Sequence, residues 1–125
     1  MKFSIIIPCY NEEKNIPLII EKFCEIIKAD DTEVIIVNNG STDNSHQIIT
    51  EHIASHHFFK LVIIPINQGY GFGILSGLNA AKGDFIGWTH ADMQTDPTDV
   101  TKAFSLIEKN NFDTKIFIKG SRKGR

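Results

Sequence analysis

The hydrophobic residues of the chain fall into short continuous runs that alternate with amphipathic stretches. The continuous runs are rich in Ile and Val, as expected for strands that are buried on both faces. The amphipathic stretches repeat apolar residues at helical spacing. Predicted strands cover residues 3–9, 33–37, 58–64, 85–88 and 114–118, and a predicted helix follows each of the first four. This alternation predicts an α/β fold, with a mostly parallel, doubly wound sheet and helices on both faces.

Polar and small residues indicate where the helices begin and end. Asn11 is placed to cap the first helix, and Asp96 is placed to cap the fourth, with Pro97 as its first residue. The pair Lys82–Gly83 is typical of a helix end, so we expect the third helix to stop there. The third helix is predicted to carry Ile74, Leu75, Leu78 and Ala81.

Polar residues gather at the points where the predicted strands end. With right-handed crossovers, the carboxyl ends of parallel strands lie along one edge of the sheet, and open α/β sheets bind ligands at that edge. The polar clusters are residues 10–12, 38–43, 67–71 and 90–94. The last cluster combines an imidazole, a carboxylate and an amide, which could hold a hard divalent cation and its phosphates. The sequence therefore predicts a ligand cleft.

Composition narrows the class of protein. The chain has 125 residues, of which 42% are hydrophobic and 22% charged, which is typical of one soluble globular domain. A net charge of −2 gives no reason to expect nucleic-acid binding. We expect no membrane span and no signal peptide, because no apolar run is long enough. Cys9 and Cys24 are expected to be reduced, which fits a cytoplasmic protein.

Three other chemistries are less well supported. Glycines at 69, 71, 73 and 77 resemble a nicotinamide- or flavin-binding loop, but that fingerprint requires glycine where Ser76 stands and belongs to the first strand. Close helix–sheet packing explains Gly73 and Gly77 more simply. His52 and His56 are one helical turn apart, but no further ligand completes a metal site, so a solvated helix end is favoured. Ser41 has no evident base, so nucleophilic catalysis is poorly supported.

Four motifs, taken together, resemble the family 2 glycosyltransferases with the GT-A fold. They occur in the family's order and span essentially the whole chain. The stretch from Asn67 to Gln94 is most similar to the branch that makes polyprenyl-phosphate sugars, such as the dolichyl-phosphate mannose synthases. The motifs are Ile5–Glu13, Val37–Asp43, Asn67–Gly71 and His90–Gln94.

The resemblance implies a site for the nucleotide of a sugar donor. Pro8, Tyr10 and Glu12 correspond to the loop that holds the base and ribose of a UDP- or GDP-sugar. Asn38 and Asn39 stand where the family commonly has aspartates that contact the base or ribose. An amide keeps the hydrogen-bonding capacity of a carboxylate but lacks its charge, so the base preference is left open.

The resemblance also implies a site for Mg²⁺ or Mn²⁺ at the diphosphate. Asp92 corresponds to the second carboxylate of the family's D-x-D motif, and His90 stands where the first would be. Gln94 matches a position that assists the metal in the polyprenyl branch. Gly69 and Arg122 complete the expected donor-binding set, with Arg122 near a donor or acceptor phosphate.

Elementary chemistry agrees with a metal at this position. A nucleotide diphosphate leaves readily only when its charge is neutralised, which a metal does as a Lewis acid. Replacing Asp with His lowers the negative charge of the site by one and favours metals that accept imidazole, such as Mn²⁺. We expect Asp92 to be the essential ligand and His90 to be optional.

We therefore expect a metal-dependent, inverting glycosyl transfer from a UDP- or GDP-sugar to a polyprenyl phosphate, at the cytoplasmic face of a membrane. Residues 1–125 are expected to form a single domain that supplies the donor half, because a GT-A domain normally continues with acceptor-side strands. The alternative is a non-catalytic nucleotide-sugar-binding or assembly module, which the missing acceptor half and His90 favour. An incomplete sheet exposes an edge, so self-association into a homo-oligomer is also predicted.

Overall fold

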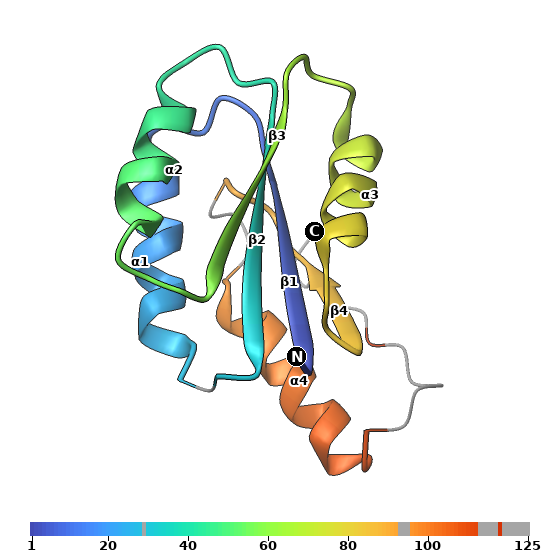
Figure 1. The fold of residues 1–125 in the computed structure, drawn as a ribbon. Helices are drawn as coiled ribbons and strands as arrows, with labels where there is room; N and C mark the ends of the chain where they lie inside the picture. The colour runs from blue at the N-terminus through green and yellow to red at the C-terminus, as the bar shows by residue number, and fades with distance from the viewer. Residues whose placement is uncertain (29, 93–95, 113–117, 119–125) are drawn as a thin grey trace, which may run out of the picture.

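Four parallel strands form the centre of the molecule in the computed structural model (Figure 1). The structure describes residues 1–28, 30–92, 96–112 and 118. The sheet order is β3-β2-β1-β4, so β1 and β2 are the inner strands. The predicted parallel sheet is confirmed, whereas the predicted fifth strand falls mainly on residues 113–117, outside the described residues. The strands are β1 (Phe3–Cys9), β2 (Thr32–Asn39), β3 (Phe59–Ile64) and β4 (Phe85–Trp88).

The inner strands are buried along their whole length. β1 pairs with β2 from Phe3 opposite Thr32 to Cys9 opposite Asn38, and every residue of both strands is buried. Continuous Ile and Val runs suit this position, because helices cover both faces of a parallel sheet. β4 pairs only with β1 and alternates half-buried with exposed residues, so it forms an edge of the described sheet.

Helices cover both faces of the sheet, as predicted (Figure 1). Three of them enclose the larger core on one face, which includes Ile5, Phe23 and Phe104. The third helix covers the smaller core on the other face, which includes Ile6 and Val37. None of the described helices is both long and apolar enough to cross a membrane. The helices are α1 (Ile16–Ile26), α2 (Ser45–Ile53), α3 (Tyr70–Ala80) and α4 (Thr98–Lys109).

Helix α3 packs on the sheet through glycines, and two of its leucines face outward. Leu75 and Leu78 are 58% and 42% exposed, while Gly73 and Gly77 are buried. A Cβ on Gly77 would clash with Ile6 and would lie 3.1 Å from Val37 Cγ2. The helix backbone thus approaches the sheet too closely for a large side chain, and this packing accounts for both buried glycines without a dinucleotide.

Two predicted helix-end residues have other roles. Asn11 does not cap α1, which begins at Ile16; it has a φ of +53° and lies in the preceding loop. Gly83 does not end α3, because the chain is already extended at Ala81. A Cβ on Gly83 would lie 2.6 Å from Ser4 N, so this glycine allows a close approach to β1.

The start of α4 agrees with the prediction to within one residue, because the helix begins at Thr98 and Pro97 stands just before it. The Asp96 carboxylate accepts a hydrogen bond from the Thr98 N–H at 3.0 Å, as an N-terminal capping residue does. Pro97 already has helical dihedral angles, with φ −53° and ψ −26°. This hydrogen bond to Thr98 holds the pKa of Asp96 below its ordinary value.

Candidate functional site

The loops that follow the four strands meet at one edge of the sheet, which we call the carboxyl edge (residues 10–15, 40–44, 65–69 and 89–92). Gly40 brings two of these loops into contact. Its φ is +69°, and a Cβ on it would lie 2.6 Å from the Ile66 carbonyl carbon. Only glycine combines this conformation with this close approach. The loops after β2 and β3 therefore pack backbone to backbone.

Asn11 joins the loops after β1 and β2. Its Oδ1 accepts hydrogen bonds from the N–H groups of Thr42 at 2.7 Å and Asp43 at 3.3 Å. Its own N–H donates to Ser41 Oγ at 3.0 Å. Asparagine tolerates the left-handed conformation better than most residues, which suits this position. This role was not predicted from the sequence. The usable signal is the Ser41-Thr42-Asp43 loop, which follows the next strand about 30 positions later.

A second group of hydrogen bonds fixes the same pair of loops. Asp43 accepts from the N–H groups of Ser45 at 2.9 Å and Glu13 at 3.3 Å. Burial acts to raise the pKa of Asp43, but these hydrogen bonds outweigh it and hold the pKa below its ordinary value. The Glu12 N–H donates to Ser45 Oγ at 3.1 Å. The backbone around the expected base-binding loop is therefore held rigidly.

The three expected residues of the first loop differ in their exposure. Pro8 is buried in β1, whereas the Tyr10 ring is 47% exposed. The Glu12 carboxylate accepts a hydrogen bond from Asn15 Nδ2 at 2.8 Å. Cys9, between the first two, is a free thiol whose pKa burial raises to about 11, so it is neutral near pH 7 and is not an activated nucleophile. Of the three expected residues, Tyr10 is the most available to a ligand.

Asn38 and Asn39 are buried, with exposed fractions of 4% and 3%. Asn39 Nδ2 donates to the Gly69 carbonyl at 2.8 Å, and Asn39 Oδ1 accepts from the Gln68 N–H at 3.1 Å. Asn38 Oδ1 accepts from the Ser41 N–H at 3.3 Å. The Asn39 amide thus ties the end of β2 to the loop before α3, a role that the sequence pattern does not reveal.

The start of α3 is open. Gly69 has a φ of +90° and precedes the helix, and no side-chain hydrogen bond caps this end. A Cβ on Gly69 or Gly71 would meet nothing within 4 Å. Free N–H groups and the helix dipole give such an end a partial positive charge, which favours a negatively charged group. Gly69 therefore lies where a phosphate could approach the backbone.

Tyr70, His90 and Asp92 lie together at the carboxyl edge. The rings of Tyr70 and His90 stack with centroids 5.4 Å apart and planes 13° apart. Burial, followed by the nearby charge of Asp92, raises the pKa of Tyr70. The Thr89 N–H donates to the Ile6 carbonyl at 3.1 Å, which keeps this loop beside β1.

The structure describes only some of the residues expected at a metal site. Among the described residues, no three His, Cys, Asp or Glu side chains come close enough to form a complete protein ligand set. Asp92 and His90 come from one loop and provide a carboxylate and an imidazole, which suit Mn²⁺. The other expected contributors, Gln94 and Arg122, lie outside the described residues. His52 is exposed, as expected for a solvated helix end, and its Nδ1 lies 2.8 Å from the Ile48 carbonyl oxygen.

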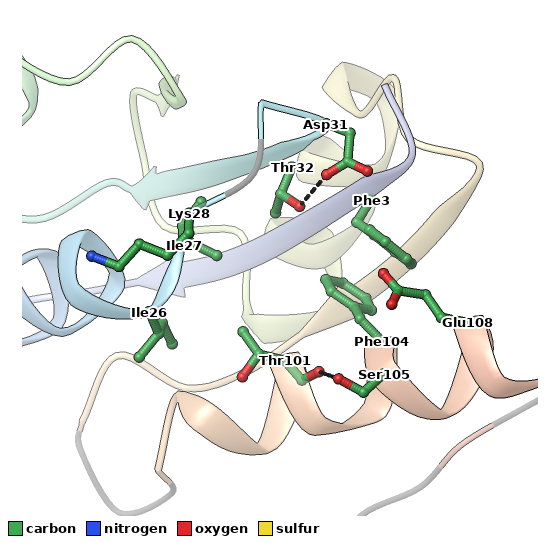
Figure 2. Close-up of a pocket in the computed structure, with 10 residues that line it drawn as sticks. All are labelled: Phe3, Ile26, Ile27, Lys28, Asp31, Thr32, Thr101, Phe104, Ser105 and Glu108. Carbon is green, nitrogen blue, oxygen red and sulfur yellow. Dashed lines mark hydrogen bonds between the residues drawn. The ribbon is translucent and has the colours of Figure 1, made fainter.

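A cavity of about 200 Å³ lies at the opposite, amino-terminal edge of the sheet, between the end of α1, the starts of β1 and β2, and α4 (Figure 2). Its lining includes the stacked rings of Phe3 and Phe104, with centroids 4.1 Å apart, together with Asp31 and Glu108. None of the expected site residues lines it. This cavity is therefore separate from the carboxyl edge.

Comparison with known proteins identifies the family. The model of glycosyl transferase family 2 matches residues 4–122. The chain belongs to glycosyl transferase family 2. Its relatives include undecaprenyl-phosphate 4-deoxy-4-formamido-L-arabinose transferases. The enzyme from Yersinia enterocolitica is 33% identical over 113 residues, which cover 86% of this chain and 34% of the relative. The enzyme from Proteus mirabilis is 32% identical over 114 residues.

Solved structures agree with the family 2 assignment and with a GT-A-like fold. TarS residues 1–349 of S. aureus, in complex with UDP-GlcNAc, superimposes with a TM-score of 0.76 and 27% identity, covering 89% of this chain and 32% of that one. The mannosyltransferase PcManGT of Pyrobaculum calidifontis, in complex with GDP-Man and Mn²⁺, superimposes with a TM-score of 0.68 and 26% identity. The match covers 73% of this chain and 27% of PcManGT. The chain thus spans about a third of the length of the relatives it matches.

Proposed function

We propose that this chain is the donor-binding part of a metal-dependent glycosyltransferase that transfers a sugar from a UDP- or GDP-sugar to a polyprenyl phosphate. The observation that carries the proposal is the carboxyl edge. There, hydrogen bonds and ring contacts join the loops after all four strands around Tyr70, His90 and Asp92. Ligands bind at this edge in open α/β sheets. We further propose that residues 1–125 form a single domain that acts at the cytoplasmic face of a membrane.

Each part of the donor has a candidate partner. The exposed Tyr10 ring, with Pro8 and Glu12, would contact the base and ribose. Asn38 and Asn39 would act mainly by shaping the pocket, because the Asn39 amide already hydrogen-bonds the loop before α3. Gly69, at the open start of α3, would face the diphosphate.

Asp92 and His90, with Gln94 from the same loop, would hold Mg²⁺ or Mn²⁺. The metal would supply charge neutralisation for the departing nucleotide diphosphate. Arg122 would contribute a positive charge near a donor or acceptor phosphate. Two structural neighbours support this arrangement, since TarS is solved with UDP-GlcNAc and PcManGT with GDP-Man and Mn²⁺. The names of the relatives support an undecaprenyl-phosphate acceptor.

Calorimetry with UDP-glucose and GDP-mannose, with and without Mn²⁺, tests the donor site. We expect one nucleotide to bind more tightly with metal, and Asp92→Asn to abolish that metal-dependent gain. Asp99→Asn is the matched control, because Asp99 is an exposed carboxylate in the first turn of α4. Nucleotide binding that is insensitive to both metal and Asp92→Asn would refute the metal role.

A non-catalytic nucleotide-sugar-binding module is the second candidate. It is favoured by His90 at the first position of the metal motif, where the family has a carboxylate. A turnover assay with undecaprenyl phosphate distinguishes the two, since a binding module would bind the donor without forming lipid-linked sugar. Self-association through the outer edge of β4 in the described sheet stays a prediction, which light scattering across a concentration series would test.

A further inference from the structure

The stack between Tyr70 and His90 connects two separate parts of the carboxyl edge. Tyr70 is the first residue of α3, and His90 lies two positions beyond the end of β4. A centroid distance of 5.4 Å and an interplanar angle of 13° describe a parallel ring contact. Such contacts have a preferred geometry, so each ring restricts the orientation of the other.

The backbone that carries Tyr70 is anchored independently of His90. Asn39 Nδ2 holds the Gly69 carbonyl at 2.8 Å, immediately before Tyr70. One turn later, the buried Gly73 brings α3 against the end of β2, where a Cβ would lie 3.2 Å from the same Asn39 nitrogen. The Tyr70 ring therefore projects from a fixed point toward the loop after β4.

The loop that carries His90 also carries Asp92. Ala91, between them, is 3% exposed and packs in the larger core, which leaves His90 and Asp92 half-buried on either side of it. His90 and Asp92 are therefore held on one short segment, which the buried Ala91 fixes to the core.

We propose that Tyr70 is a positioning residue, whose ring fixes the His90 imidazole and thereby the loop that presents Asp92 to the donor diphosphate. This inference rests on the proposed function for the identity of the ligand. The aromatic ring of Tyr70, and not its hydroxyl group, makes the contact that positions His90. Phenylalanine should therefore replace tyrosine at this position, and a residue without a ring should not.

Phe72 offers a matched control on the same helix. Tyr70 and Phe72 are both aromatic and both 48% exposed, but of the two only Tyr70 stacks on His90. The test uses the full chain with Tyr70→Phe, Tyr70→Ala, His90→Ala, the double variant Tyr70→Ala/His90→Ala, and Phe72→Ala. Calorimetry measures the affinity for UDP and GDP in the presence of Mn²⁺, and NMR measures the shifts of the His90 ring and of the Ala91 and Asp92 amides.

Tyr70→Ala should weaken nucleotide binding by roughly two- to tenfold, the range expected from losing one aromatic pair. His90→Ala should weaken it at least as much, because this variant also removes a proposed metal contact. The double variant should be no weaker than His90→Ala alone, because Tyr70 acts through His90. Tyr70→Phe and Phe72→Ala should match the parent chain. Tyr70→Ala should shift the His90 ring and the Asp92 amide, whereas Phe72→Ala should not.

Two results would overturn the positioning role. One is equal damage from Tyr70→Phe and Tyr70→Ala, which would assign the effect to the hydroxyl. The other is unchanged His90 and Asp92 resonances in Tyr70→Ala. If the parent chain binds no nucleotide, the proposed function fails, and the NMR comparison of Tyr70→Ala with Phe72→Ala still decides whether Tyr70 holds the loop.

Discussion

The two edges of the sheet use polar side chains in opposite ways. At the amino-terminal edge, the Glu33 carboxylate is 1% exposed and pairs with Lys60 Nζ at 2.6 Å. It also accepts hydrogen bonds from Ser4 Oγ and the Lys82 N–H, both at 2.6 Å. At the carboxyl edge, asparagines and hydroxyl groups join the loops, and Tyr10 stays exposed.

This difference separates stability from binding. Glu33 and its partners satisfy one another, and through Lys82 they fasten the segment after α3 to the inner strands. These polar groups bond one another inside the protein, so they are not arranged to bind a ligand. At the carboxyl edge, the hydrogen bonds fix the backbone of the loops, while Tyr10 stays exposed and His90 and Asp92 stay half-buried. Rigid loops with accessible side chains are what a binding site requires.

The largest expected effect on stability comes from removing Glu33, which joins Ser4, Lys60 and Lys82 at the amino-terminal edge. Glu33→Ala removes three contacts and leaves the Ser4 hydroxyl and the Lys82 N–H without their acceptor. We expect a loss of about 3 kcal/mol in the free energy of unfolding, near the low end for broken buried pairs because Lys60 is 38% exposed and reaches water. Urea denaturation measures it. The control is Glu21→Ala, because Glu21 is exposed. A similarly small loss of unfolding free energy in both variants would contradict the stabilising role of the amino-terminal edge.

The same network should make stability depend on acid. Burial acts to raise the pKa of Glu33, but hydrogen bonds from Lys60, Ser4 and Lys82 outweigh it, and the pKa lies below its ordinary value. A carboxyl group with a lowered pKa stabilises the fold fully above its unfolded value, about 4.3, and this stabilisation is lost as the pH falls through the folded pKa.

Urea midpoints measured from pH 7 downward test this dependence. The parent chain should lose stability below about pH 4. Glu33→Gln should start from lower stability and lose less over that acid range, because it has no proton to take up at this position. Other carboxylates titrate in the same range, so the difference between the two curves is the relevant quantity. Parallel curves would rule out a contribution from Glu33.

A smaller effect is expected at the carboxyl edge from Asn39→Ala. It leaves the Gly69 carbonyl and the Gln68 N–H without their buried partner, which costs about 2 kcal/mol. Hydrogen exchange should show faster exchange at the Gln68 amide, and nucleotide affinity should fall because the start of α3 moves. The exposed Asn79→Ala, on α3 itself, is the matched control. If Asn39→Ala lowers stability but leaves nucleotide affinity unchanged, the loop before α3 is not part of the donor site.

The smallest effect is expected at Asn11, which is exposed. Asn11→Gly keeps the left-handed conformation but loses the side-chain hydrogen bonds to the loop after β2, and should cost about 1 kcal/mol. Asn11→Ala adds backbone strain and should cost about 1 kcal/mol more. Thermal unfolding of the two variants compares them directly. An alanine variant as stable as the glycine variant would show that the conformation at this position is not strained.

Much of the fold could be predicted from the sequence. Continuous Ile and Val runs identify β1 and β2, because only strands covered on both faces are uniformly apolar. The Asp96–Pro97 pair identifies the start of α4 through local chemistry alone. The placement of the polar clusters at strand ends follows from chain connectivity, so the sequence also predicted which edge of the sheet carries the loops around Asp92.

Only the tertiary structure decided which face of α3 is buried and which residues join the loops. Helical periodicity shows which residues share a face, but the distance to the sheet decides that Gly73 and Gly77 face inward and Leu75 outward. The partners of Asn11 and Asn39 lie about 30 positions away in the chain. The contact between Tyr70 and His90 is likewise created by the sheet order, because neither residue carries a local signal for the other.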